Sequence, residues 1–256
     1  MILVEGIAEQ LLVPVLAEHI GCSLEEHHVA LIPVGGVTFK HFVPLFGAGL
    51  PPEQVCFALR RPVACLIDAD PTRKRRVPNA KFTKCYPYEI DTGADYEDKP
   101  RSDVLTALTT LCAASNNITV AYGTKTLEYD LARHNHTQTL LVTDSCTHAA
   151  RLRELFNDAT ATPDELADTL ITARDTTAHL AGPECAAHVV ATCYLRSLED
   201  AKGEHALALA KALKDATGTP ASHAFTVPPA IATAIRWASR QPAPTPQTNQ
   251  APTPAA

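Results

Sequence analysis

This sequence has no CxxC pair, no apolar run of membrane-spanning length and no excess of positive charge, and each absence argues against a class of protein or site. The 8 cysteines form no CxxC pair, so we expect reduced, buried thiols rather than a zinc site or a disulfide framework. No apolar run reaches the length of a membrane-spanning helix, and no basic segment precedes the apolar N-terminus. We therefore expect a cytoplasmic protein with no membrane partner. The net charge of −6 gives no global attraction to nucleic acid, so any such binding must rest on local patches or on metal ions.

The apolar segments of the first half predict alternating strands and helices. Short β-branched or wholly apolar stretches predict strands at 2–4, 28–34, 63–67 and 118–122. Helices are expected to begin near residues 7, 38, 103 and 126, and Pro14 is expected to kink the first of them. Because the stretch at 63–67 is apolar throughout, it should be buried on both faces. The pattern predicts an α/β fold, a parallel Rossmann-like sheet flanked by helices.

Beyond about residue 140 the pattern predicts helices only. They are expected at 147–156, at 163–173, in one long segment from about 183, and at 229–238. The closing residues, QPAPTPQTNQAPTPAA, have low complexity and nothing to bury. We therefore expect three parts: a sheet domain at 1–139, a C-terminal helical extension at 140–238, and a disordered Pro/Thr/Ala-rich tail at 239–256.

Acidic residues follow two of the predicted strands. Glu5 comes directly after the first, and Asp68 and Asp70 follow the strand at 63–67. Carboxyl ends of parallel strands line the crevice where ligands bind, and side chains two residues apart in a strand share a face. Glu9 lies one helical turn beyond Glu5 and can face the same crevice, although such a pair is more often a solvated helix face. Four gathered carboxylates would repel one another unless cations lay among them, and such oxygen ligands suit Mg²⁺ or Mn²⁺.

Sequence motifs around these acids resemble a known family. LVEGIAE, IPVGG and ACLIDAD look like the Toprim domain, which carries a glutamate after its first strand and a DxD after a later one. Three later motifs are similar to the C-terminal half of the OLD (overcoming lysogenization defect) family of ATP-dependent endonucleases: GTKTLEYDL at 123–131, KGEHALALA at 202–210 and FTVPPAIATAI at 225–235. The resemblance implies a Toprim catalytic domain at 1–139, a helical extension at 140–238 that completes the active site, and a metal-dependent DNA endonuclease.

The resemblance also implies a site for two divalent ions, Mg²⁺ or Mn²⁺. Two-ion cleavage of a phosphodiester needs one ion to lower the pKa of an attacking water and another to stabilise the leaving oxygen. A lysine can then neutralise charge that builds on the phosphate. The expected catalytic residues are Glu5, Asp68, Asp70 and Lys202. The expected metal ligands are Glu5, Glu9, Asp68, Asp70, Thr126 and Glu128.

A dense basic stretch follows Asp70. Basic side chains neutralise phosphates whatever the base sequence, so this stretch is a candidate DNA contact. A solvated, mobile loop is an equally good interpretation. The residues are Arg73, Lys74, Arg75 and Arg76.

Departures from the family pattern leave alternatives open. The family's proteins normally carry an ATPase domain ahead of the Toprim part, and this sequence has no GxxxxGK[ST] motif. We therefore expect no ATP site in this chain and DNA as a partner, with a separately encoded ATPase subunit and a homo-oligomer left open. LIDADPT also fits the nucleophile motif of haloacid-dehalogenase-like phosphatases, with Asp68 as the nucleophile, but no glycine is followed by aspartate as that family requires. The other alternative is a catalytically degenerate fragment that only binds DNA or a partner.

Overall fold

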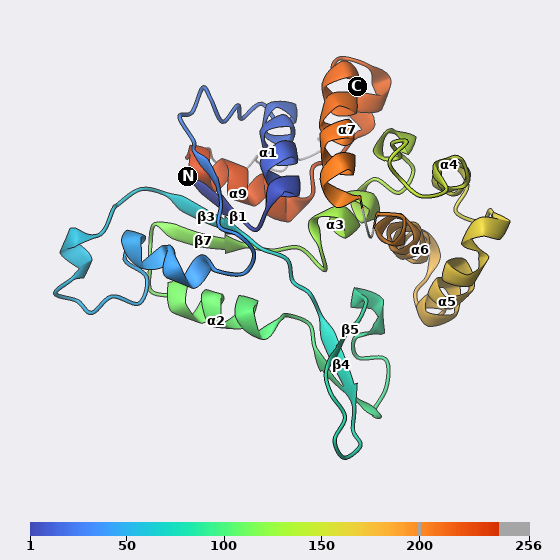
Figure 1. The fold of residues 1–256 in the computed structure, drawn as a ribbon, viewed down its shortest axis with the longest axis horizontal. Helices are drawn as coiled ribbons and strands as arrows, with labels where there is room; N and C mark the ends of the chain where they lie inside the picture. Colours follow the sequence, from blue (N-terminus) through green and yellow to red (C-terminus); the bar gives the residue numbers. More distant parts are fainter. Residues whose placement is uncertain (199–200, 241–256) are drawn as a thin grey trace, which may run out of the picture.

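A four-stranded parallel sheet forms the centre of the molecule. The computed structural model describes residues 1–198 and 201–240. The strand order is β2-β1-β3-β7, and every neighbouring pair is parallel (Figure 1). The strands are β1 (Ile2–Val4), β2 (Leu31–Pro33), β3 (Val63–Leu66) and β7 (Ile118–Ala121). Their register places Val4 beside Pro33 and Leu66, and Leu66 beside Ala121, so the carboxyl ends of all four strands meet at one edge.

Both faces of this sheet are covered, which explains why β1 and β3 are apolar at every position. Ile2, Val4, Ala64 and Leu66 belong to a core shared with α1 (Ile7–His19) and α9 (Pro229–Ser239). The alternate residues, Leu3, Val63 and Cys65, belong to a core on the other face, shared with α2 (Asp103–Cys112). Figure 1 shows α1 and α9 on one side of the sheet and α2 on the other. The expected α/β fold with a parallel sheet flanked by helices is therefore confirmed.

The chain segment between β3 and α2 forms a second, antiparallel sheet, although its sequence suggested only a polar segment. It has the order β5-β4-β6, formed by β4 (Thr72–Arg75), β5 (Thr83–Lys84) and β6 (Tyr96–Lys99). No apolar alternation marks these strands. Their cross-strand neighbours are instead of opposite charge, with Arg73 beside Asp98 and Lys74 beside Glu97.

The second half is helical, as expected. After α3 (Leu127–His134) come α4 (Ala149–Asn157), α5 (Ala167–Thr177), α6 (Gly182–Arg196), α7 (Lys202–Asp215), α8 (Pro220–Ala224) and α9. α3 packs on α6, α7 packs on α1, and α9 lies on β3 and β7. One hydrophobic core extends from the sheet face covered by α1 and α9 through α3, α6 and α7. The division of the chain at residue 139 stays a prediction.

Three local expectations were wrong. The helix expected after Thr38 is a pair of 3₁₀ turns, η1 (Phe39–His41) and η2 (Val43–Phe46), which end at Gly47 with a positive φ. The strand expected at 28–34 is limited to Leu31–Pro33, because His28 has a positive φ that no strand accommodates. The long helix expected from residue 183 is divided into α6 and α7, and the Ser197 hydroxyl bonds the Tyr194 carbonyl at 2.7 Å where α6 ends. Pro14, where a kink was expected, lies inside α1, which continues as one helix on both sides of it.

The remaining expectations concern cysteines, membrane and tail. All eight cysteines are free, and six of them are buried. Across residues 1–198 and 201–240, no helix has both the length and the apolar character needed to cross a membrane. The tail expected at 239–256 lies outside the described residues except for its first two positions, where Ser239 ends α9.

Candidate metal centre

The carboxyl edge of the parallel sheet brings together acids from three separate segments. Glu5, directly after β1, accepts a hydrogen bond at its Oε1 from the backbone N–H of Asp68, at 2.9 Å. Asp68 follows β3 and accepts at its Oδ1 from the N–H of Leu127, at 3.0 Å. Leu127 is the first residue of α3, whose N-terminal N–H groups favour negative charge. Two strand ends and one helix start are thus tied together through carboxylates.

The loop before α3 is held against the Asp-x-Asp segment by its backbone. The Lys125 carbonyl accepts from the N–H groups of Ala69 and Asp70, at 2.9 and 3.2 Å. The buried Asp130 carboxylate accepts from the Thr124 N–H, at 2.9 Å. It lies so close to Gly123 that a Cβ at that position would overlap it. Glycine at 123 therefore allows the turn that brings α3 to the acidic edge.

Two further acids, Glu9 and Glu128, are buried beside this edge. Glu9 lies in the first turn of α1 and accepts at its Oε2 from the Gly6 N–H, at 3.0 Å. Glu128 lies in the first turn of α3, and its Oε2 is 2.9 Å from the Lys202 ammonium nitrogen. Lys202 begins α7, so the helical half of the chain supplies a cation to the acids of the sheet half. Thr126 is the N-cap of α3, and its hydroxyl accepts from the Tyr129 N–H at 3.4 Å.

These carboxylates affect one another's protonation. Burial raises the pKa of Glu5, and repulsion from Glu9 and Asp70 raises it further, against the hydrogen bond from Asp68. Burial and then Glu128 raise the pKa of Glu9. Asp68 keeps some exposed surface, but its carboxyl is packed among protein atoms. Its pKa is raised well above the usual value by burial and by the charges of Glu128, Glu5, Glu9 and Asp70. Burial alone would lower the pKa of Lys202, but its pairing with Glu128 outweighs this and raises it.

The expectation that Asp68 and Asp70 share a face rested on the alternation of side chains in a strand. β3 ends at Leu66, and Asp70 has a left-handed backbone with φ 42°, so the two-residue alternation of a strand does not extend to it. Its Oδ2 is 3.1 Å from the Lys84 ammonium nitrogen, while its Oδ1 is buried and has no hydrogen-bond partner among the described residues. Within the same residues, no three His, Cys, Asp or Glu side chains are close enough together to hold a metal ion as they stand.

The residues at this edge nevertheless suit a divalent cation in their chemistry. The donors are carboxylate oxygens and one hydroxyl, the hard ligands that Mg²⁺ and Mn²⁺ take. The hydrogen bonds described above engage a single oxygen of Glu5, Glu9 and Asp68, which leaves the second oxygen of each for a cation. The buried Oδ1 of Asp70 has no partner that would compete with a cation. A cation would also relieve the repulsion that raises the pKa values of Glu5, Glu9 and Asp68.

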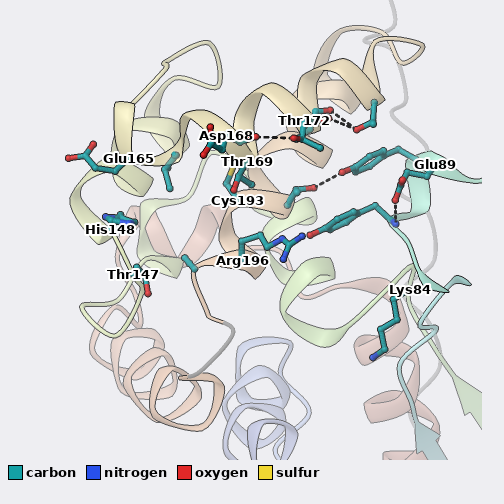
Figure 2. Close-up of a pocket in the computed structure, with 17 residues that line it drawn as sticks. Lys84, Glu89, Thr147, His148, Glu165, Asp168, Thr169, Thr172, Cys193 and Arg196 are labelled. Carbon is teal, nitrogen blue, oxygen red and sulfur yellow. Dashed lines mark hydrogen bonds between the residues drawn. The ribbon is translucent and has the colours of Figure 1, made fainter.

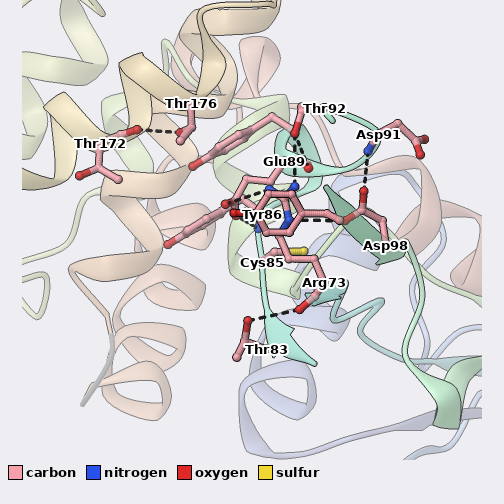
Figure 3. A network of polar contacts seen from close by, with 12 residues as sticks. Arg73, Thr83, Cys85, Tyr86, Glu89, Asp91, Thr92, Asp98, Thr172 and Thr176 are labelled. Carbon is pink, nitrogen blue, oxygen red and sulfur yellow. Dashed lines mark hydrogen bonds and ion pairs between the residues drawn. The ribbon is translucent and has the colours of Figure 1, made fainter. Parts of the chain in front are cut away.

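The basic stretch after Asp70 lies on β4 and is partly engaged within the protein. Arg73 contacts Asp98 and Glu89, at 3.4 and 3.6 Å (Figure 3). Its guanidinium also stacks on the Tyr96 ring. Lys74 pairs with Glu97 at 2.9 Å. Arg75 and Arg76 are exposed at the end of the strand. Of the four residues expected to contact DNA, the two exposed arginines are therefore the most accessible.

Three residues near the acids were missed by the sequence reasoning. Lys84, on β5, pairs with Asp70 as described, but its segment showed only polar composition. Lys125 is buried, donates to the Cys85 carbonyl at 2.8 Å, and lies 4.7 Å from the centre of the Tyr86 ring. Burial lowers the pKa of this lysine. Lys125 and Asp130 both lie within the GTKTLEYDL motif at 123–131, and its resemblance to the OLD family was the sequence feature that could have indicated them.

A large cavity lies between the antiparallel sheet and the helical half. Its volume is about 800 Å³, and η4 (Pro87–Glu89), α5 and α6 line it (Figure 2). Lys84 also lines it. Because the same lysine pairs with Asp70, this cavity adjoins the acidic edge.

Comparison with known families gives this geometry a context. Residues 1–70 match the family model described as "Overcoming lysogenization defect protein-like, TOPRIM domain". This segment is an OLD-like Toprim domain. It spans β1, α1, β2 and β3 and ends at Asp70, so it includes Glu5, Glu9 and both aspartates of the Asp-x-Asp segment. The Toprim domain of the OLD family is a metal-dependent, nuclease-type fold that generally binds divalent cations.

The chain is also similar to solved structures. The chain is similar to the C-terminal region of the Burkholderia pseudomallei OLD protein, with 18% identity and a TM-score of 0.49 over 93% of this chain and 96% of that one. It is also similar to the C-terminal region of the Xanthomonas campestris pv. campestris OLD protein, with 21% identity and a TM-score of 0.45 over 93% and 91% of the two chains. No curated protein matches the chain. The assignment to the OLD-like Toprim domain rests on residues 1–70.

Proposed function

We propose that this protein is a DNA endonuclease that uses two Mg²⁺ or Mn²⁺ ions to nick or cleave phosphodiester bonds. The observation that carries the proposal is the meeting of Glu5, Asp68 and Glu128, from β1, β3 and α3, at the carboxyl edge of an OLD-like Toprim domain. Burial and mutual repulsion raise the pKa values of Glu5, Glu9 and Asp68 and cost stability, and a site that binds cations gives a reason for the presence of these acids.

The ligands proposed for the two ions are carboxylates and one hydroxyl from four segments. When bound, such ions lower the pKa of an attacking water and stabilise the leaving oxygen. The protein's part is to hold the oxygen ligands in place through the backbone hydrogen bonds of Gly6, Asp68 and Leu127. The proposed ligands are Glu5, Glu9, Asp68, Asp70, Thr126 and Glu128.

Lys202 is the proposed phosphate-contacting cation. Its ammonium group lies 2.9 Å from Glu128 and has a raised pKa, so it is charged at neutral pH. A charged lysine at the edge of the acidic centre can stabilise negative charge that develops on a phosphate. Its position at the start of α7 supports the proposal that the helical extension completes the active site.

DNA is the proposed substrate, and its backbone is proposed to approach along the antiparallel sheet. Arg75 and Arg76 are exposed there, and Lys84 lies between Asp70 and the adjoining cavity. Arg and Lys neutralise phosphates independently of base sequence. Along this path the DNA backbone meets the exposed arginines first and then reaches the acids. These arginines provide local positive charge in a protein whose net charge is negative.

Nicking of supercoiled plasmid by the pure protein tests the proposal. Mn²⁺ should support conversion to open-circular DNA, and excess EDTA should abolish it. Asp68→Asn should lose the activity, whereas Asp215→Asn should keep it, because Asp215 is exposed at the end of α7 and away from the acids. Equal nicking by Asp68→Asn, or none by the unaltered protein, would refute the proposal. Asp68-dependent hydrolysis of p-nitrophenyl phosphate without nicking would favour the phosphatase alternative.

A further inference from the structure

A second candidate site lies at the opposite edge of the parallel sheet. A cavity of about 520 Å³ is lined there by Arg60, Asn116, Asn117, Arg236, Trp237 and Arg240. Asn117 directly precedes β7, so the cavity lies at the amino ends of the strands, away from the acids. α9 connects the two edges. Pro228, at its start, lines a small cavity with Asp68, and Trp237, near its end, lines the one described here.

The charged residues that line this cavity are all positive, although the net charge of the chain is negative. The cavity is lined by three arginines and by no acidic residue. None of these arginines forms an ion pair within residues 1–198 and 201–240, although the chain has 28 acidic and 22 basic residues. Arg236 and Arg240 lie at the C-terminus of α9, where the helix dipole favours cations. That accounts for two of the arginines but not for Arg60, which comes from the loop before β3.

The wall that carries Arg60 is held in place by the half-buried side chain of Asn117. The side-chain amide of Asn117 donates to the carbonyls of Phe46, Leu59 and Arg61, at 3.1, 3.3 and 3.2 Å. These bonds hold the loop on both sides of Arg60 against the start of β7. The guanidinium is thereby attached to a constrained backbone, which reduces the entropy lost when a ligand binds.

The opposite wall carries an aromatic surface. Trp237 is 38% exposed and is the single tryptophan of the chain. An indole beside guanidinium groups is a combination that recognises an aromatic ring bearing phosphate. The ring is accepted by stacking, and the phosphate oxygens accept bidentate hydrogen bonds from arginine.

We propose that this cavity binds a free nucleotide, with the phosphates on Arg60, Arg236 and Arg240 and the base on Trp237. The volume lies in the range of small-molecule sites, roughly 300–1,000 Å³. One aromatic side chain in a hollow suits one base, whereas single-stranded nucleic acid needs a row of aromatic platforms along a groove. The site is separate from the acidic centre and does not depend on the endonuclease proposal.

Trp237 gives a direct measurement, because all tryptophan fluorescence of the protein comes from this cavity. The protein is titrated with ADP, AMP, adenosine and inorganic phosphate, with excess EDTA present so that no cation can attract phosphates to the acidic centre. Fluorescence is corrected for nucleotide absorption and checked by calorimetry. We expect saturable quenching by ADP and AMP, tighter for ADP, and weaker binding of adenosine and of phosphate.

Variants test whether ADP binds in this cavity or to positive charge elsewhere on the surface. Arg60→Gln combined with Arg240→Gln should weaken ADP binding by at least about tenfold, since charge-assisted contacts are lost. Both side chains are exposed, so the fold should persist, which a melting curve verifies. Arg151→Gln, on α4, is the matched control and should bind ADP normally. Trp237→Ala, followed by calorimetry, should lower ADP affinity towards that of inorganic phosphate.

Three results would overturn the proposal. The first is the absence of saturable binding of either nucleotide by fluorescence and calorimetry. The second is unchanged ADP affinity in the double arginine variant. The third is binding of a short single-stranded oligonucleotide at Trp237 without binding of free nucleotides, which would make the cavity a nucleic-acid contact.

Discussion

Replacing His205 by glutamine should remove a defined part of the pH dependence of stability. His205 lies on α7, one turn after Lys202, and is only 1% exposed. Its Nδ1 is 2.8 Å from the Thr143 hydroxyl, and its Nε2 bonds the Tyr194 hydroxyl. Burial lowers its pKa from 6.5 to about 4. The imidazole is therefore neutral in the folded protein at neutral pH and anchors the helix that carries Lys202.

The magnitude follows from linkage between protonation and folding. The folded-state pKa lies below the unfolded one, so the unfolded chain takes up the proton first as the pH falls. The contribution of neutral His205 to the free energy of unfolding is complete above about pH 6.5 and is lost as the pH falls towards about 4. A shift from 6.5 to about 4 corresponds to roughly 3 kcal/mol, at about 1.4 kcal/mol per pH unit.

Urea unfolding of the unaltered protein and His205→Gln, from about pH 7 down to about pH 4.5, measures this contribution. The difference in unfolding free energy between the two proteins should shrink by roughly 2–3 kcal/mol over this range. Taking the difference cancels the similar contribution of His188. It also cancels that of Glu5, Glu9 and Asp68, whose raised pKa values act in the opposite direction. A difference that stays constant with pH would refute the buried, neutral state of His205.

Three further substitutions test parts of the same construction through urea unfolding. Gly123→Ala should lower the unfolding free energy by roughly 2–4 kcal/mol, because its Cβ displaces the Asp130 carboxylate; a loss below about 0.5 kcal/mol would contradict this. Lys202→Met should cost roughly 1–2 kcal/mol, since buried Glu128 loses its partner while Lys202 itself is 40% exposed; Lys202→Arg is the control, and equal stability of all three proteins would refute the pairing. Pro14→Ala should raise stability by roughly 1 kcal/mol by restoring a helical N–H within α1, and a loss of stability would show that the proline is needed there.

Much of the parallel sheet was predictable because its two central strands, β1 and β3, are buried at every position. β1 and β3 are uninterrupted apolar runs, and each is followed by acids at a position that parallel topology places at one edge. The antiparallel sheet was not predictable in this way, because charge pairs such as Arg73 with Asp98 stabilise it and leave no apolar alternation. The boundary between α6 and α7 was missed because no proline or glycine marks the end of α6.

The candidate site was predictable in its members but not in their arrangement. Glu5 and Asp68 follow from strand ends, while Glu128 and Lys202 came only from family motifs. The orientation of Asp70 depends on its left-handed backbone, and its pairing with Lys84 depends on a sheet that the sequence does not announce. The buried Lys125 and Asp130 act through backbone contacts, which residue type alone does not reveal.

Calorimetric titration with Mn²⁺ tests the central claim most directly, because the claim is that the acids at the carboxyl edge of the sheet bind divalent cations. The unaltered protein should bind Mn²⁺ saturably and release protons as the acids with raised pKa values lose them. Asp68→Asn and Glu5→Gln should each lose most of this binding, whereas Asp215→Asn should bind as the unaltered protein does. Mn²⁺ binding that is the same in all four proteins, or absent from the unaltered one, would contradict the account.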